Sequence, residues 1–112
     1  MTVEKIAAVF NMEIVAGESG INKQINDVYC CDLLSFAMSK APESSAWITV
    51  MGNVNVIAVA SLADVACIIM ADGATPDKNA IEKANEHSIP ILKTKESAFH
   101  IGKRIYDALT LS

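Results

Sequence analysis

The sequence predicts a three-layer α/β/α sandwich with a mostly parallel, mixed central sheet. From residue 46 onward, apolar runs of strand length alternate with segments of helical period, which is the order of parallel βαβ units. One of those runs, residues 66–70, is apolar without interruption, as is typical of a strand buried on both faces of a sheet. Right-handed crossovers then place the helices on the faces of the sheet.

The N-terminal segment predicts one helix and one short strand. Apolar residues recur at helical spacing over residues 3–10, and the Thr2 hydroxyl is suited to cap the helix. Asn11 is the expected end of that helix. Residues 13–16 form the predicted strand, which Gly17 closes.

A second extended segment and a second helix follow. Residues 25–31 are expected to be extended. Asp32 is placed to cap a helix over residues 33–40, and Pro42 terminates that helix because proline cannot continue it.

Three strands at residues 46–51, 66–70 and 89–92 are expected to lie parallel and side by side. The apolar segment 54–65 between the first two is too long for an ordinary strand, so we interpret it as a buried helix.

Two further helices complete the predicted order. Thr75 and Pro76 predict the start of one, with threonine at the N-cap and proline at the first helical position. The last covers residues 97–111, where apolar residues recur at helical spacing.

Composition limits the function classes. With 112 residues, 52% of them hydrophobic and 20% charged, the chain is long enough and apolar enough to fold as a single domain, residues 1–112. The net charge of −4 and a single arginine, Arg104, argue against nucleic-acid binding.

Nothing in the sequence predicts a membrane protein or a secreted one. No apolar run approaches the roughly 20 residues of a membrane span, and no signal-peptide pattern is visible. Three cysteines cannot all pair with one another, so we expect reduced thiols and a cytoplasmic protein.

The candidate ligand-binding residues follow the predicted strands. Open α/β sheets bind ligands beyond the carboxyl ends of their strands, so glycine, amide, hydroxyl and amine groups in those loops suit a small anion. For each of these residues taken singly, ordinary turn and capping chemistry is the more common explanation. The candidates are Gly52, Asn53, Asp72, Gly73, Thr94 and Lys95.

The cysteines do not form a metal-binding motif. Cys30 and Cys31 precede a predicted helix, whose N-terminus would lower a thiol pKa. On a strand, however, the two side chains point to opposite faces, and we expect one of them to be buried and inert. Because no C-x-x-C spacing or histidine cluster is present, we predict structural cysteines and no metal site.

No catalytic constellation is visible. His87 is expected at the end of a helix and His100 on the surface of the last helix, without a nucleophile or orienting carboxylate at a recognisable spacing. Asp32, Asp64 and Asp72 could gather for Mg²⁺, but nothing in the sequence brings them together. We therefore predict a protein that is not an enzyme and carries no cofactor.

The sequence resembles the DRTGG domain family. The similar segments are residues 21–35, 46–50, 63–69 and 88–92, and the most specific of them are Asp32-Leu33-Leu34-Ser35 and the block 63–69. The signature that names the family is altered: Asn22-Lys23 stand where the family has Asp-Arg, and Asn26-Asp27-Val28 where it has Thr-Gly-Gly. This loop lacks the bidentate arginine donor and the glycines.

The resemblance implies a fold similar to the N-terminal domains of HPr kinase and the Mur ligases, and a regulatory role. We therefore expect a non-catalytic, ligand-sensing module that forms a homodimer and binds a small anion such as an adenine nucleotide. The alternative is a protein-interaction adaptor for a redox or hydrogenase-type complex, without a small-molecule ligand.

Overall fold

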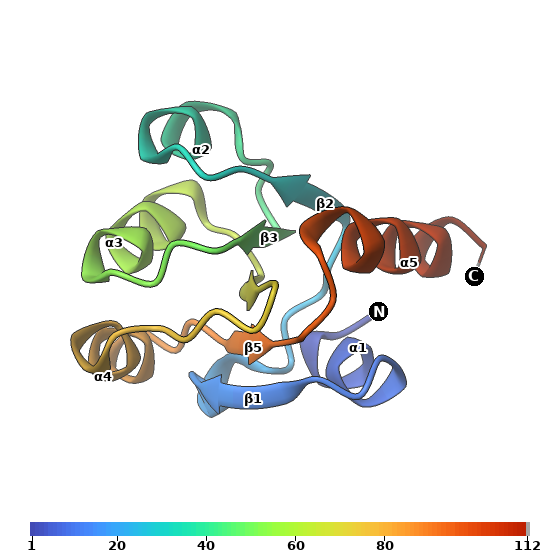
Figure 1. The fold of residues 1–112 in the computed structure, drawn as a ribbon, viewed down its shortest axis with the longest axis horizontal. Coiled ribbons are helices and arrows are strands. Elements are labelled where there is room, and N and C mark those ends of the chain that lie inside the picture. Colours follow the sequence, from blue (N-terminus) through green and yellow to red (C-terminus); the bar gives the residue numbers. More distant parts are fainter. Residues whose placement is uncertain (112) are drawn as a thin grey trace.

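The computed structural model describes residues 1–111, in which five strands form one sheet between two layers of helices (Figure 1). The strands are β1 (Glu13–Ala16), β2 (Asp27–Cys30), β3 (Ser45–Thr49), β4 (Cys67–Met70) and β5 (Ile91–Lys93). The helices are α1 (Val3–Val9), α2 (Leu34–Lys40), α3 (Val54–Ala63), α4 (Lys78–Glu86) and α5 (Ala98–Leu111), with a short 3₁₀ helix η1 (Glu18–Gly20).

The sheet is mixed and mostly parallel, with the strand order β1-β5-β4-β3-β2. Strands β2, β3, β4 and β5 pair in parallel, whereas β1 pairs antiparallel with β5 and places Ile14 opposite Leu92. The predicted parallel arrangement of the three C-terminal strands is confirmed, and so is a helix in the apolar segment between the first two.

Each parallel strand is added on the same side of the one before it, so right-handed crossovers carry α2, α3 and α4 to one face of the sheet. Helices α1 and α5 cover the other face (Figure 1). Alternate residues of the central strands point into the two layers: Trp47 and Ile68 face α2, α3 and α4, while Ile48 and Cys67 face α1 and α5. The core is therefore divided in two by the sheet.

The predicted cap of the first helix is confirmed, but that of the second is wrong. Thr2 Oγ1 accepts a hydrogen bond from the Lys5 N–H, at 3.1 Å. Asp32 caps nothing; its Oδ1 accepts from Thr49 Oγ1 at 2.7 Å and from the Val50 N–H at 2.9 Å. Because the Thr49 hydroxyl is buried and needs a partner, Asp32 turns toward β3, and Leu33 takes the N-cap position without a side-chain bond.

The predicted start of the fourth helix is also wrong. Thr75 Oγ1 accepts a hydrogen bond from Lys93 Nζ at 2.7 Å instead of capping the helix. The Asp77 N–H donates to the Gly52 carbonyl at 2.7 Å, which keeps the chain extended through Asp77. Helix α4 consequently begins at Lys78.

Strand β3 and helix α3 end earlier than predicted, the strand because side chains bind the backbone N–H groups that follow it and the helix because a left-handed residue follows it. Strand β3 ends at Thr49, since Asp32 binds the Val50 N–H and Thr49 Oγ1 accepts from the Met51 N–H. Helix α3 ends at Ala63, where Asp64 adopts a left-handed φ of 55°. Within residues 1–111, no helix has both the length and the apolar character needed to cross a bilayer.

Candidate ligand-binding site

The four parallel strands end at one edge of the sheet, so the loops after them meet there. Asp32 follows β2, Gly52 and Asn53 follow β3, Asp72 and Gly73 follow β4, and residues 94–96 follow β5. This is the edge at which open α/β sheets bind ligands. The six residues predicted from the sequence all lie along it, but the structure divides them among three environments.

Gly52 and Asn53 serve the packing of α3 and α4. The Asn53 side chain accepts from the Asn55 N–H at 2.9 Å and caps α3. A Cβ atom on Gly52 would lie 2.8 Å from the Thr75 carbonyl oxygen and 2.9 Å from Pro76 Cα. The gap beside these two residues is lined mostly by apolar side chains and leaves no space for a water molecule, so no ligand fits there as the structure stands.

Asp72 and Gly73 form a tight turn that is joined to the loop after β5. Both have left-handed backbones, with φ of 54° and 69°. The Asp72 N–H donates to the Glu96 carbonyl at 2.8 Å, and the Gly73 N–H donates to the Thr94 carbonyl at 2.9 Å. These two N–H groups are therefore engaged within the protein rather than directed at an anion. These two hydrogen bonds hold the loops after β4 and β5 together at the centre of the edge where the parallel strands end, which we call the strand-end edge.

Thr94 and Lys95 line an open groove of about 500 Å³ beside β5. The groove lies between the end of β5 and the turn that connects α1 to β1, because β1 runs antiparallel to β5 and starts where β5 ends. Its volume falls in the range of roughly 300–1,000 Å³ that is usual for small-molecule sites. Its lining residues are Phe10, Asn11, Glu13, Lys93, Thr94, Lys95 and Glu96.

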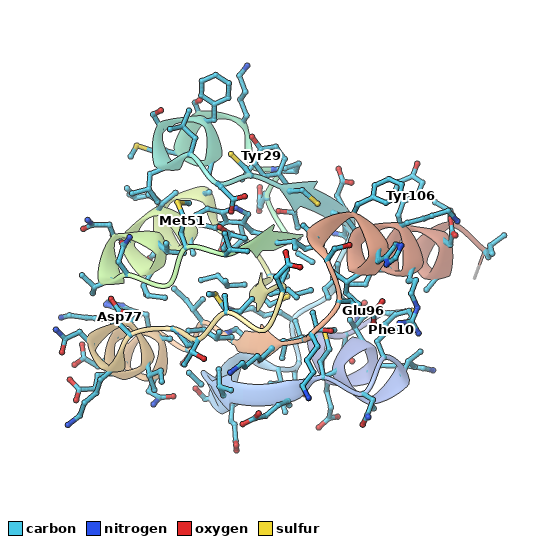
Figure 2. All side chains as sticks on the ribbon, in the orientation of Figure 1. Phe10, Tyr29, Met51, Asp77, Glu96 and Tyr106 are labelled. Carbon is cyan, nitrogen blue, oxygen red and sulfur yellow. The ribbon has the colours of Figure 1, made fainter. Side chains whose placement is uncertain are left out.

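The charges around this groove are partly paired. Arg104 of α5 forms a close ion pair with Glu96, and its guanidinium carbon lies 4.8 Å from the centre of the Phe10 ring. Figure 2 shows Glu96 and Phe10 near one another between α5 and α1. Since Arg104 balances Glu96, the remaining formal charges lining the groove are those of two lysines, Lys93 and Lys95, and one carboxylate, Glu13.

Thr94 is equipped to donate a hydrogen bond into the groove. Its Oγ1 accepts from the Glu96 N–H at 3.2 Å, which leaves the hydroxyl proton for another acceptor. Together with the lysine ammonium groups, the groove offers donors that suit the oxygen atoms of a phosphate or carboxylate.

The aspartates, cysteines and histidines form no second site in the part of the chain that the structure describes. Asp32 binds β3, Asp64 ends α3, and Asp72 lies in the turn after β4. Over residues 1–111, no three His, Cys, Asp or Glu side chains are close enough to hold a metal ion. His87 is the C-cap of α4, as predicted, and His100 is exposed on α5 with its ring 6.3 Å from that of Phe99.

The prediction for the adjacent cysteines is only partly confirmed. The two side chains do lie on opposite faces: Cys30 faces α5, and Cys31 packs with the layer of α2, α3 and α4. Neither, however, is buried, because the side chains at the end of an edge strand are only partly covered. Partial burial and then the Asp32 carboxylate raise the pKa of Cys30, so the helix that follows does not activate this thiol.

The altered signature loop lies at the opposite, amino-terminal edge of the sheet. Lys23 Nζ donates to the Ser88 carbonyl at 3.0 Å, and the Asn26 N–H donates to the Ser44 carbonyl at 2.9 Å. Asp27 Oδ1 accepts from the Val28 N–H at 2.8 Å. These contacts join the segments that precede β2, β3 and β5, which is a structural role.

Sequence reasoning missed most of the groove. Phe10 and Asn11 lie in the turn after α1 and Glu13 begins β1, and nothing in their spacing relates them to residues 93–96. Only the antiparallel pairing of β1 with β5 brings the two segments together.

The comparisons with known proteins agree with this fold. The model of the DRTGG domain family matches residues 5–108. No curated protein matches the chain in sequence.

One similar solved structure contains the CBS and DRTGG domains of the regulatory region of Clostridium perfringens pyrophosphatase, complexed with its activator, diadenosine tetraphosphate. It matches with a TM-score of 0.66 at 18% sequence identity, covering 91% of this chain and 44% of that chain. The present chain thus spans less than half the length of that structure, and the likeness shows the fold. Because the family model covers nearly the whole sequence, this chain belongs to the DRTGG domain family.

Proposed function

We propose that the chain is a non-catalytic regulatory module that self-associates and binds a small anionic ligand, such as an adenine nucleotide, in the groove beside β5. The observation that carries the ligand proposal is the position of Lys93, Thr94 and Lys95 together in an open groove of about 500 Å³ at the carboxyl end of a parallel strand. By contrast, the loops after β4 and β5, at the centre of the same edge, are joined by hydrogen bonds and leave the Asp72 and Gly73 N–H groups engaged.

The lysines of the groove favour an anion, although the chain as a whole is negatively charged. The net charge of −4 repels anions from most of the surface, so binding requires a local cationic site. Lys95 supplies one ammonium group, and Lys93 supplies a second whose Nζ already donates one hydrogen bond to Thr75 Oγ1. The ion pair with Arg104 neutralises Glu96. The ligand we expect is therefore one that carries phosphate groups.

The related regulatory region supports an adenine nucleotide as the first candidate, because that region is complexed with diadenosine tetraphosphate. Of the residues named from the sequence, Thr94 and Lys95 are the ones we propose as direct ligand contacts. Gly52, Asn53, Asp72 and Gly73 would then act by holding the adjoining loops in place.

Thermal unfolding in the presence of AMP, ATP and diadenosine tetraphosphate tests the ligand proposal. A ligand at 100 times its dissociation constant stabilises the folded state by about 2.7 kcal/mol, so a saturable rise of the midpoint is expected. Lys95→Ala should weaken binding at least tenfold, since a charge-assisted hydrogen bond contributes ~1.5–3 kcal/mol. Lys5→Ala, which removes an exposed lysine from α1, is the matched control and should bind as the wild type does. If none of the three nucleotides shifts the midpoint at millimolar concentration, the ligand proposal is wrong.

Sedimentation equilibrium tests the proposed self-association. A homodimer is expected at micromolar concentration, and a monomer at several hundred micromolar would contradict it. A single cooperative unfolding transition is the expected behaviour if residues 1–112 fold as one domain.

A protein-interaction adaptor for a redox or hydrogenase-type complex, without a small ligand, is the second candidate. It is favoured by exposed aromatic side chains on α5: Phe99 is 73% exposed and Tyr106 53%. The nucleotide titration separates the two candidates, because an adaptor of this kind shows no stabilisation by any of the nucleotides.

A further inference from the structure

The groove beside β5 has two walls of different chemistry. One wall is the end of β5 with the loop after it, residues 93–96. The other is the turn between α1 and β1 together with the first residue of β1. Glu13 is the cross-strand neighbour of Lys93, so the two walls adjoin where β1 pairs with β5 (Figure 1). We call three residues the turn wall: Phe10, Asn11 and Glu13.

Glu13 gives the turn wall a carboxylate without a cationic partner. The amine of its neighbour Lys93 is directed elsewhere, because Lys93 Nζ donates to Thr75 Oγ1 at 2.7 Å. Among residues 1–111, Glu13 forms no ion pair with a lysine, arginine or histidine. A carboxylate repels phosphate and accepts hydrogen bonds from amines. The turn wall is therefore unsuited to the phosphate groups of a ligand and suited to an amine.

Asn11 adds an amide that is free to bind. It follows α1 with a left-handed φ of 53°, and its backbone N–H donates to the Ala8 carbonyl at 3.3 Å. Its side chain is exposed and takes part in no hydrogen bond within the part of the chain that the structure describes. The amide offers both an acceptor and donors, which match the exocyclic amine and the adjacent ring nitrogen of adenine.

Phe10 supplies the apolar part of the turn wall and is held from two sides. It packs against the core cluster between the sheet and the layer of α1 and α5. The Arg104 guanidinium carbon lies 4.8 Å from the centre of its ring, and Arg104 is in turn held by its ion pair with Glu96. Figure 2 shows Phe10 and Glu96 near one another. A fixed aromatic side chain is a surface against which a planar base can pack.

We propose that the turn wall binds the base of the nucleotide and selects a base with an exocyclic amine, while Thr94 and Lys95 bind the phosphate groups. Glu13 and Asn11 are then the specificity-determining residues, because both accept hydrogen bonds from the amine of adenine. A base with a carbonyl oxygen in that place turns an acceptor toward the Glu13 carboxylate, and the two acceptors repel each other. This inference rests on the proposed function and deepens it by assigning the other half of the same groove.

The size of the groove agrees with this division. A phosphate group on Lys95 would occupy only a small part of about 500 Å³, and it would leave the turn wall without a role. A nucleotide uses both walls, with its anionic end at the lysines and its base at the end that carries the carboxylate.

ATP and ITP are the sharpest pair of probes for the turn wall. They share the ribose and the triphosphate and differ only in the base, where hypoxanthine has a carbonyl oxygen in place of the exocyclic amine of adenine. Isothermal titration calorimetry of the full chain should show ATP binding at least about tenfold more tightly than ITP, because a site built around a hydrogen bond rejects the analogue that lacks it. Tripolyphosphate, which has no base, reports binding to the phosphate groups alone.

Glu13→Gln tests the carboxylate directly. Glutamine keeps the size of the side chain, and its amide can donate to a carbonyl oxygen, so the preference for ATP over ITP should fall below about threefold. Glu18→Gln is the matched control, since Glu18 is an exposed glutamate in η1, beyond the other end of β1. It removes the same charge and should leave the preference unchanged. Both side chains are exposed, so both variants should fold, as their thermal midpoints will verify.

Asn11→Gly tests the amide without straining the turn. Glycine adopts the left-handed backbone of this position, so only the side chain is lost. We expect ATP to bind several-fold more weakly to this variant and tripolyphosphate to bind as it does to the wild type. This difference separates recognition of the base from recognition of the phosphate groups.

The outcomes distinguish this inference from the proposed function. If the wild type binds neither ATP, ITP nor tripolyphosphate, the ligand proposal and the role of the turn wall are both wrong. If ATP binds and Lys95→Ala weakens its binding, the phosphate site stands. In that case, equal binding of ATP and ITP overturns the turn wall as the base site. An unchanged preference in Glu13→Gln, or an equal loss of ATP and tripolyphosphate binding in Asn11→Gly, overturns it as well.

Discussion

Gly52 and Gly73 follow neighbouring parallel strands at the same edge of the sheet, yet the structure requires glycine at the two positions for different reasons. At Gly52 a side chain would collide with the Thr75–Pro76 backbone, with contacts of 2.8 and 2.9 Å. At Gly73 a Cβ atom would have nothing within 4 Å, but the φ of 69° disfavours any residue with a side chain. The first glycine provides space, whereas the second provides backbone freedom.

The difference shows how this protein closes the strand-end edge. Gly52 lets the loop after β3 touch the loop that leads into α4, and Gly73 forms the turn whose N–H group binds the loop after β5. Both glycines therefore tie loops together. The ligand site we propose lies next to this closed region, where β5 meets the turn before β1.

Gly52→Ala is the substitution with the largest expected effect on stability. The added methyl group must displace backbone atoms rather than a flexible side chain, and overpacking of this kind costs roughly 1–3 kcal/mol, of which we expect the upper part. Urea denaturation measures the change. A loss below about 0.5 kcal/mol would show that the loops after β3 and β4 separate easily, and the contrast with Gly73 would fail.

Cys67 is a second tightly packed position, and its thiol is fully buried. Burial raises the pKa of Cys67 from 9.0 to about 12. Above pH 9 the Cys67 thiol ionises in the unfolded chain but stays protonated in the folded chain. The contribution of this thiol to the free energy of unfolding is therefore complete below pH 9 and is lost as the pH rises toward 12. At pH 10 the loss is about 1.4 kcal/mol.

Cys67→Ala provides the control for this prediction. The unfolding free energy of the variant should fall less than that of the wild type between pH 8 and 10, whatever its value at pH 8. Equal pH dependence of the two proteins would show that Cys67 is accessible to hydroxide in the folded state.

Substitutions at Gly73 should have the smallest effects, with about 1 kcal/mol for Gly73→Ala, because only the left-handed backbone opposes them. Gly73→Asn should cost less than Gly73→Ala, since asparagine tolerates this conformation. The order of stabilities from urea denaturation is therefore wild type, Gly73→Asn, Gly73→Ala and Gly52→Ala. If alanine and asparagine cost the same at position 73, backbone conformation is not the reason for glycine there.

The sequence by itself determined the order of the elements and the parallel core of the sheet. The unbroken apolar run in β4 is buried on both faces, as predicted. Helix α3 also forms where predicted and lies between α2 and α4, but it is not buried all round, because Ala58, Ser61 and Leu62 are exposed. The Thr2 cap was also predictable, because a cap depends on neighbours in the chain.

Only the tertiary structure decided which polar groups became partners. Asp32 and Thr75 have the sequence context of helix caps, but Thr49 and Lys93, far away in the chain, recruit their side chains. The groove beside β5 depends in the same way on an antiparallel pairing between residues about 80 positions apart. Local patterns encode burial and turns, whereas hydrogen-bond partners and grooves arise from segments that meet only after folding.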